Sequence, residues 1–228
     1  PGEKAYVPVL IEMDGADLLA GHQGDALPTE VYAYALDRRG GVADFFTQAM
    51  ALDLAEAGDA LRATGFKYWG HFDLEPGDYV VRVMARNGAT GVSSLESVPL
   101  RVPAFGEETA VLPPLFPEAP GSWLIGREQE AEQRDVPYPF MLRGQPYIPA
   151  ARPLVARGGE AQLYLVGYNL AEELLVESRL VGADGKVVQG TELTVAERIA
   201  GGSSDQMVAT FRPGKAAAPA PRSAEVMA

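Results

Sequence analysis

Hydrophobic and polar positions alternate along much of the first hundred residues, and this pattern predicts short β-strands. Between residues 78 and 86 every odd position is apolar or aromatic, whereas three of the five even positions are charged. A period of two is typical of antiparallel strands that bury one face. Turn residues such as Asp14-Gly15 and Asn87-Gly88 separate the strands. The other strands expected here are residues 5–13, 29–37, 66–74 and 94–102.

The pattern is ambiguous over residues 44–64, which read DFFTQAMALDLAEAGDALRAT. Ala, Leu, Met and Glu favour a helix, but Phe46, Met50 and Leu52 also fit the alternation of a strand. We expect a strand up to about Leu54, followed by a short helical turn over residues 57–63.

A proline-rich segment follows the first group of strands. Nine of the 18 prolines lie between residues 103 and 149. Proline cannot donate to a strand ladder, so long central strands are not expected there, and we interpret residues 104–149 as a connector. Within it, the charged residues 127–135 are expected to form a solvated loop. Phe116 and Trp123 indicate that parts of the connector pack against a folded domain.

Strand patterns return after the connector, over residues 160–168, 173–181, 186–198 and 205–212. Asp184 and Gly185 are a hairpin signal between two of them. The tail, residues 215–228, is rich in Ala and Pro, has no apolar period, and is expected to be extended or disordered.

The two groups of strands share a weak repeat. In the first, Pro76-Gly77 leads into a strong strand, whereas in the second Pro213-Gly214 leads directly into the tail. The second domain therefore looks one or more strands short. Its open edge would be covered by the connector or by another protein, unless the domain needs fewer strands.

The predicted fold is all-β, with two tandem immunoglobulin-like antiparallel sandwiches joined by the connector. The predicted segments are a first sandwich at 1–103, the connector at 104–149, a second and incomplete sandwich at 150–214, and a tail at 215–228.

Composition narrows the classes of function. The chain has 228 residues, a net charge of −12, no cysteine, 25 glycines and 18 prolines. The acidic balance disfavours binding to nucleic acid or to anionic lipid. The lack of cysteine excludes disulfides, thiolate metal sites and a cysteine nucleophile. No run of 18 apolar residues occurs, so no membrane-spanning segment is expected.

Candidate catalytic groups are few. His71 lies in an aromatic strand and is expected to pack there, whereas His22 is expected in an exposed glycine-rich loop. Nucleophile-elbow and phosphate-loop motifs do not occur. Asp14 and Asp17 are the best local candidates for calcium ligands, although a plain turn explains them as well. We therefore expect no enzyme activity, no catalytic residues, no cofactor and no metal site.

Four aromatic residues of the strands have two interpretations. Tyr32, Tyr34, Tyr68 and Trp69 could form a sugar-stacking platform on an exposed sheet face. Tyrosine and tryptophan are also favoured in strands for packing alone. The first interpretation defines the alternative function, a carbohydrate-binding module.

The most specific motif is LEPGDYVVRV, residues 74–83. Pro76 and Gly77 form a turn between two strands, and Tyr79 at the start of the second strand can return its hydroxyl to an upstream backbone group. This arrangement resembles the tyrosine corner of immunoglobulin-like and fibronectin type III-like sandwiches. More narrowly, residues 65–103 resemble the C-terminal β-domains of exported bacterial proteins, known mostly from Acidobacteria-like genomes, that carry a von Willebrand factor A-type domain.

This resemblance implies export and a role in assembly or adhesion. The metal-binding motif of the A-type domain, Asp-x-Ser-x-Ser, does not occur, so its adhesion chemistry is not implied. The predicted function is a non-catalytic structural or protein–protein interaction module, acting through sheet edges, loops and the connector. A protein partner or larger assembly and a secreted, periplasmic or cell-surface location are expected, and the oligomeric state is left open.

Overall fold

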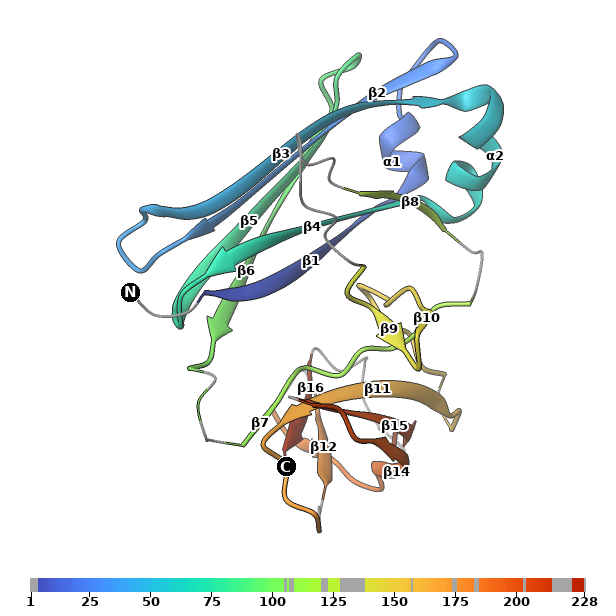
Figure 1. Cartoon of the computed structure of the whole chain (residues 1–228). Helices are drawn as coiled ribbons and strands as arrows, with labels where there is room; N and C mark the ends of the chain where they lie inside the picture. Colours follow the sequence, from blue (N-terminus) through green and yellow to red (C-terminus); the bar gives the residue numbers. More distant parts are fainter. Residues whose placement is uncertain are drawn as a thin grey trace. The chain divides into compact units, whose positions relative to one another are not determined.

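The computed structural model describes residues 4–104, 106, 109–119, 123–127, 138–156, 158–173, 176–182, 185–202, 204–214 and the backbone of 223–227. Within these residues two short helices accompany 16 strands, so the all-β prediction is confirmed. The chain divides into two compact units: residues 1–104 with 120–139, and residues 105–119 with 140–228 (Figure 1). The proline-rich connector is thus divided between the units.

The first unit contains two sheets and two helices. One sheet has the order β3-β2-β5-β6 and is antiparallel throughout. The other has the order β1-β4-β8, in which β1 is antiparallel and β8 parallel to β4. The elements are β1 (Ala5–Met13), α1 (Gly15–Leu19), β2 (Ala26–Leu36), β3 (Val42–Asp53), α2 (Leu54–Thr64), β4 (Phe66–Leu74), β5 (Gly77–Asn87), β6 (Ser93–Val102) and β8 (Leu124–Arg127).

The strand followed by a helical turn, expected over residues 44–64, is confirmed as β3 and α2. Asp53 separates the two elements, since its carboxylate accepts a hydrogen bond from Ala55 N at 2.8 Å and caps the helix. Gly65 ends the helix with φ 90°, a conformation that favours glycine.

The core of the first unit lies between the apolar faces of its strands. Phe46 of β3 packs against Tyr68 and Phe72 of β4, with ring centroids 6.1 and 5.2 Å apart. The ring of Phe46 also lies over Gly70, where a Cβ atom would come within 2.8 Å of it. Glycine in the middle of β4 therefore makes room for this ring.

The second unit has a four-stranded sheet of order β14-β15-β11-β7, a three-stranded sheet of order β13-β12-β16, and the short hairpin β9–β10. Its strands are β7 (Ala110–Val111), β9 (Met141–Leu142), β10 (Gln145–Pro146), β11 (Ala161–Tyr168), β12 (Glu177–Val181), β13 (Val187–Val188), β14 (Glu192–Ile199), β15 (Asp205–Arg212) and β16 (Ser223–Met227). Its core is built mainly from alternate residues of β11 and β15, joined by Leu180 of β12.

The connector completes the second unit. Val111 and Ala110 pair with the end of β11, and Leu115 exchanges backbone hydrogen bonds with Tyr164 at 2.8 and 2.9 Å. Phe116 packs edge-on against Phe211 at 6.1 Å. The open edge expected in this domain is therefore covered along β11 by the chain itself, and it offers no site for a partner there.

The tail differs in part from the expectation. Residues 223–227 form β16, which pairs with β12 along its whole length, while the rest of the tail lies outside the described residues. The same holds for most of the charged run 127–135, of which only Arg127 is described, at the end of β8.

Candidate functional site

The four aromatic residues of the candidate platform do not share one surface. Tyr32 and Tyr34 lie on the outer face of β2, where they are half-buried. Tyr68 is fully buried in the core, and Trp69 is buried on the opposite face of β4. The structure therefore does not bring the four residues together on one surface, because β4 is buried on both faces at Tyr68 and Trp69.

The outer face of β4 holds a buried charge. The side chain of Lys67 has 0% exposure, and its Nζ lies 3.1 Å from Glu12 Oε2 on the neighbouring strand β1. The same Nζ lies 4.1 Å from the ring centroid of Trp123, which belongs to the connector. The Glu12 carboxylate compensates the charge of this ammonium group and the Trp123 ring adds a cation–π interaction, so Lys67 has the environment of a structural ion pair.

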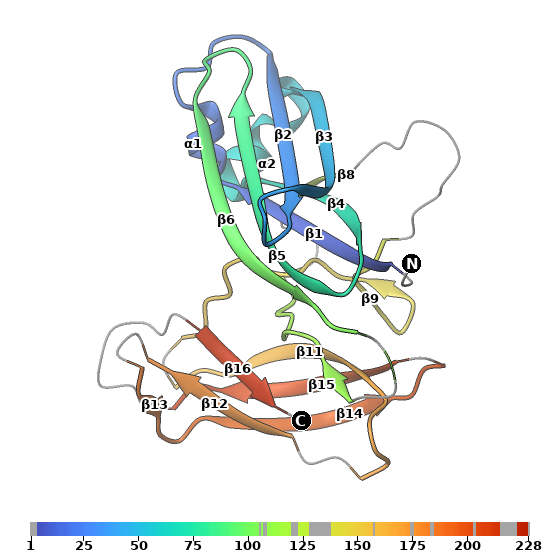
Figure 2. The ribbon, with the colours of Figure 1, turned by 90° about the vertical axis from the view of Figure 1, so that its left-hand side faces the viewer.

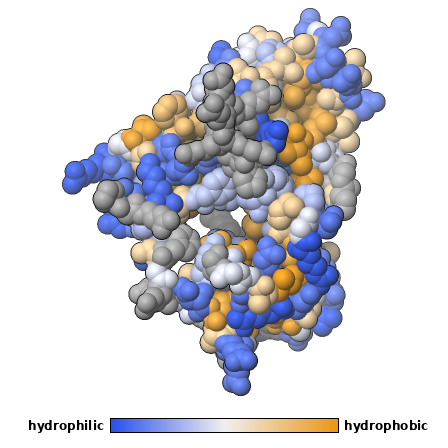
Figure 3. Space-filling view, in the orientation of Figure 1, coloured by the Kyte–Doolittle hydropathy of each residue, from blue (hydrophilic) through white to orange (hydrophobic). Residues whose placement is uncertain are grey.

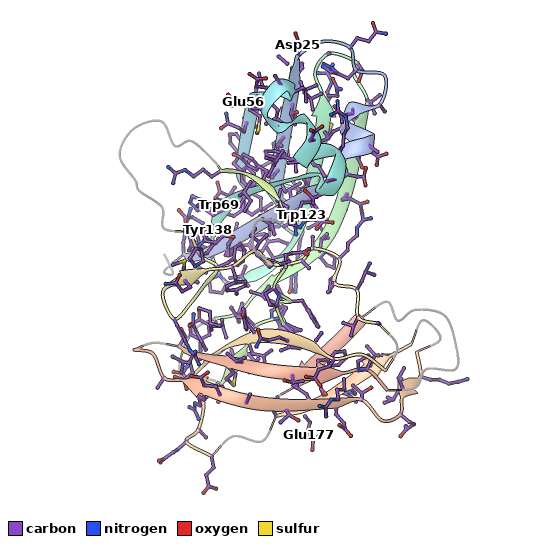
Figure 4. The ribbon with its side chains drawn as sticks, turned by 90° about the vertical axis from the view of Figure 1, so that its right-hand side faces the viewer. Asp25, Glu56, Trp69, Trp123, Tyr138 and Glu177 are labelled. Atoms are coloured by element: carbon purple, nitrogen blue, oxygen red, sulfur yellow. The ribbon has the colours of Figure 1, made fainter. Side chains whose placement is uncertain are left out.

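Aromatic packing continues on this face. Tyr138 meets Trp69 edge-on at 5.6 Å, and Figure 4 shows Trp69, Trp123 and Tyr138 close together beside the strands of the first unit. Burial raises the pKa of the Tyr138 phenol to about 12. His71 stacks on Tyr6 at 4.8 Å, which confirms its predicted packing among aromatic residues.

The outer face of the β3-β2-β5-β6 sheet, in contrast, exposes large apolar side chains. Phe45 is 58% exposed and stacks on Tyr34, with centroids 5.9 Å apart. Strand register places Tyr32, Met84 and Leu95 in one row across β2, β5 and β6. The row ends at the sheet edge with Leu95, which is 64% exposed.

Exposed apolar residues alone do not define a site, because most protein surfaces carry some. Figure 3 shows hydrophobic residues among hydrophilic ones on the surface that it presents. The edge of β6 is distinguished from these by its backbone. Figure 2 shows β6 along the margin of its sheet, where β5 is its one partner among the described strands.

The direction of the β6 backbone groups follows from one hydrogen bond. Asn87 N donates to Val92 O at 2.9 Å, so the backbone N–H and C=O groups of even-numbered residues along β6 point toward β5. In an antiparallel ladder the direction alternates, and the N–H and C=O groups of Ser93, Leu95 and Ser97 therefore point away from β5. Among the described residues nothing is hydrogen-bonded to these groups. Pro99 is the next odd residue, and it fits an edge strand because its missing donor would face outward.

The opposite edge of the same sheet, β3, is protected by side chains. The Asp44 carboxylate accepts hydrogen bonds from Phe45 N at 2.9 Å and from Asp73 N at 2.7 Å. The Gln48 amide donates to Ala49 O at 2.9 Å. Side chains that occupy edge groups in this way discourage pairing with another chain, and no such bond protects residues 93–98 in the described structure.

Val98, Leu100 and Val102 alternate along β6 and so share the face of the sheet that is turned toward the core. Val102 is buried and Leu100 is half-buried, but Val98 is 56% exposed. The first half of β6 therefore extends beyond the core with both faces accessible. Sequence reasoning did not single out this segment, although serines between apolar residues and a proline within the strand are signals of an exposed edge.

The turn residues chosen from sequence have clear structural roles. Pro76 and Gly77 lie where β4 passes into β5, and Tyr79 Oη donates to Glu75 O at 2.8 Å. Gly185 has φ 77° and its N–H bonds to Gly182 O at 2.9 Å, in the predicted hairpin between β12 and β13. Asp184 lies outside the described residues.

A shallow depression beside the first turn is lined by Arg38, Asp78 and Tyr79, among others. Arg38 donates a hydrogen bond to the Asp78 carboxylate, which lowers the pKa of that carboxyl. Since the two charges satisfy each other, this depression offers little to a charged ligand.

The remaining candidates for chemistry are accounted for locally. Asp14 caps α1 by accepting hydrogen bonds from Ala16 N and Asp17 N at 2.7 and 3.1 Å, so the expected turn is a capped helix start. His22 is half-buried rather than exposed as expected, and both of its ring nitrogens are inaccessible to solvent. Within the described residues, no group of three or more His, Asp or Glu side chains is arranged to hold a metal ion. None of the described helices is long and apolar enough to cross a membrane.

Comparison with known proteins gives no assignment: no family model matches the chain, and no curated protein matches it significantly. The resemblance to exported bacterial β-domains therefore stays a prediction.

Proposed function

We propose that this chain is a non-catalytic protein-interaction module, which takes an extended segment of a partner protein as an additional strand on the free edge of β6. The observation that carries the proposal is the outward direction of the backbone groups of Ser93, Leu95 and Ser97. In strand addition, main-chain hydrogen bonds supply affinity and alternate side chains supply specificity.

The side chains around this edge define the kind of segment that fits. Leu95 on one face and Val98 on the other are both more than half exposed. A segment with apolar residues at matching positions would cover them. Glu96 is the only charged residue between positions 92 and 98, so charge contributes little to this recognition.

A displayed library of random peptides tests the proposal on the full chain. Ser97→Pro removes one outward N–H and obstructs the edge without removing a bond to β5. Arg101→Pro is the matched control, because Arg101 has the same orientation on the same strand but lies beyond Pro99. We expect selected peptides to lose at least tenfold in affinity for the first variant and to keep it for the second. Equal binding to both variants would contradict the proposal.

The proposal extends to the fold of each unit. We propose that the first unit is an immunoglobulin-like or fibronectin type III-like sandwich from an exported bacterial protein, and that the second unit is a related sandwich. The two sheets of the first unit and the Tyr79–Glu75 hydrogen bond support the first part. Identification of the intact precursor tests the export: a leader with an upstream A-type domain is expected, and a start codon directly before Pro1 would contradict it.

A carbohydrate-binding module is the second candidate, favoured by the stacked pair Tyr34–Phe45 beside Tyr32 on an exposed sheet face. Sugar rings stack on such faces. A glycan array tests this function with Tyr34→Ala and with Leu95→Ala as a control on the same face. Binding lost only in the first variant supports the candidate, and the lack of any bound glycan contradicts it.

A further inference from the structure

We infer that the segment that occupies the β6 edge is β6 of a second copy of this chain, added antiparallel about a two-fold axis at Leu95. This inference rests on the proposed function and names the partner. It follows from how well the sequence Val92–Val98, VSSLESV, complements itself in one register.

The backbone of this segment suits self-pairing. In an antiparallel pair of strands, two residues that lie opposite each other exchange two hydrogen bonds when the backbone N–H and C=O groups of both point toward the partner strand. With Leu95 opposite Leu95 of the second copy, Ser93 lies opposite Ser97. All of these residues have outward groups, so three residue pairs form about six hydrogen bonds.

The side chains are complementary in the same register. Leu95 meets its own copy, while Val92 meets Val98 on the other face of the sheet. These residues are 64%, 47% and 56% exposed in the single chain, and they are the only large apolar residues between positions 92 and 98. Glu96 lies opposite Ser94, so no like charges face each other.

The neighbouring registers are less favourable. A shift that places Glu96 opposite Glu96 brings two carboxylates together, and it also sets Pro99, which has no N–H, opposite Ser93. A shift in the other direction places Ser94 opposite itself and leaves Val98 without a strand residue to face. Only the register centred on Leu95 pairs every exposed apolar residue of the segment.

This register also continues a feature of each sheet. The row of Tyr32, Met84 and Leu95 would run on through Leu95, Met84 and Tyr32 of the second copy. Two four-stranded sheets would thereby join into one sheet with a continuous apolar row. The contact uses only the first half of β6, so a small and concentration-dependent interface is expected.

Because the chain has no cysteine, single-cysteine variants test the register directly. In Leu95→Cys, the two cysteines of a dimer lie about 5.5 Å apart between Cα atoms, within the range for a disulfide. In the control Ser97→Cys, the two cysteines are four residues apart along the strands, about 13 Å, and cannot bond. In a Ser93→Cys/Ser97→Cys double variant, the cysteine at position 93 of each copy lies opposite the cysteine at position 97 of the other, so a disulfide can form again.

Each variant is incubated in a glutathione redox buffer, and the covalent dimer is measured on a non-reducing gel. Sedimentation velocity of the unmodified chain and of Ser97→Pro is measured over a range of concentrations. We expect covalent dimer in Leu95→Cys and in the double variant, at least tenfold more than in Ser97→Cys. We also expect reversible dimerisation that Ser97→Pro abolishes.

Two results would overturn the pairing of β6 with a second copy, and a third would overturn its register. One is a monomer at every concentration that still binds displayed peptides along β6, in which case the proposed function stands and the partner is a different protein. The other is a dimer that Ser97→Pro leaves intact, which places the contact elsewhere. Equal cross-linking of Leu95→Cys and Ser97→Cys would overturn the register.

Discussion

Lys67 Nζ lies 3.1 Å from Glu12 Oε2, and the lysine side chain is completely buried. A buried ion pair adds little stability over apolar residues, but removing one partner leaves the other charge with less compensation. The two residues should therefore respond very differently to substitution.

We expect Glu12→Gln to lower the free energy of unfolding of the first unit by about 3 kcal/mol, because it leaves Lys67 charged and buried. Lys67→Met fills a similar volume without charge, and the Glu12 carboxylate that it leaves behind is 23% exposed and can be hydrated, so stability should change by less than about 1 kcal/mol. Urea unfolding followed by tryptophan fluorescence measures both. A larger loss in Lys67→Met than in Glu12→Gln would contradict this view of the pair.

The hydrogen bond from Tyr79 Oη to Glu75 O holds the turn between β4 and β5. Tyr79→Phe keeps the ring and removes this bond, so we expect a loss of about 1 kcal/mol in unfolding free energy. Tyr34→Phe is a suitable control, since it removes a hydroxyl from the exposed face of β2. An equal effect of the two substitutions would show that the bond does not stabilise the turn.

Tyr138 makes stability depend on alkaline pH. Burial raises the pKa of its phenol from 10.0 to about 12 in the folded chain. Between these values the unfolded chain ionises while the folded chain does not, so stability is full below pH 10 and falls as the pH rises toward 12. Unfolding free energies measured across this range should fall more steeply for the wild type than for Tyr138→Phe. Parallel curves would contradict the prediction.

Asp205 makes the stability of the second unit depend on acidic pH. Hydrogen bonds from Arg198, with Nε at 2.7 Å, and from Gly201 N lower the pKa of its carboxyl below the ordinary value of 3.8. The ionised Asp205 therefore adds to the stability of the second unit. This stabilisation is fully present above the ordinary pKa of 3.8 and is lost as the pH falls through the lowered pKa. Asp205→Asn should therefore be less stable than the wild type at pH 7, with a difference that shrinks in acid. Unfolding followed by circular dichroism from pH 7 to pH 2 measures the difference, and a constant one would contradict this role.

Strands with one buried face were predictable from local sequence, because their period of two is visible within a few residues. The β5 strand and its turn at Pro76-Gly77 follow the pattern directly. The helix α1 was missed, since a five-residue helix has no apolar period and Asp14-Gly15 also fits a turn.

The long-range features could not be predicted in the same way. Pairing of β8 with β4 joins residues that are far apart in sequence. Trp123 and Tyr138, from the segment around β8, pack against Lys67 and Trp69, which are buried where the local pattern suggests an exposed face. For this reason the four aromatic residues of the candidate platform do not lie on one surface. The edge at Leu95 was missed because local pattern does not tell which strand ends a sheet or how far the core extends beneath it.

Amide hydrogen exchange along β6, followed residue by residue by NMR, tests the central proposal most directly. In the dilute chain, the amides of Ser94, Glu96 and Val98 should be protected by β5, whereas those of Ser93, Leu95 and Ser97 should exchange quickly. When the edge is occupied, by a selected peptide or by a second copy at high concentration, the odd-numbered amides should become protected as well. Fast exchange at Ser93, Leu95 and Ser97 in the bound state would contradict strand addition at β6.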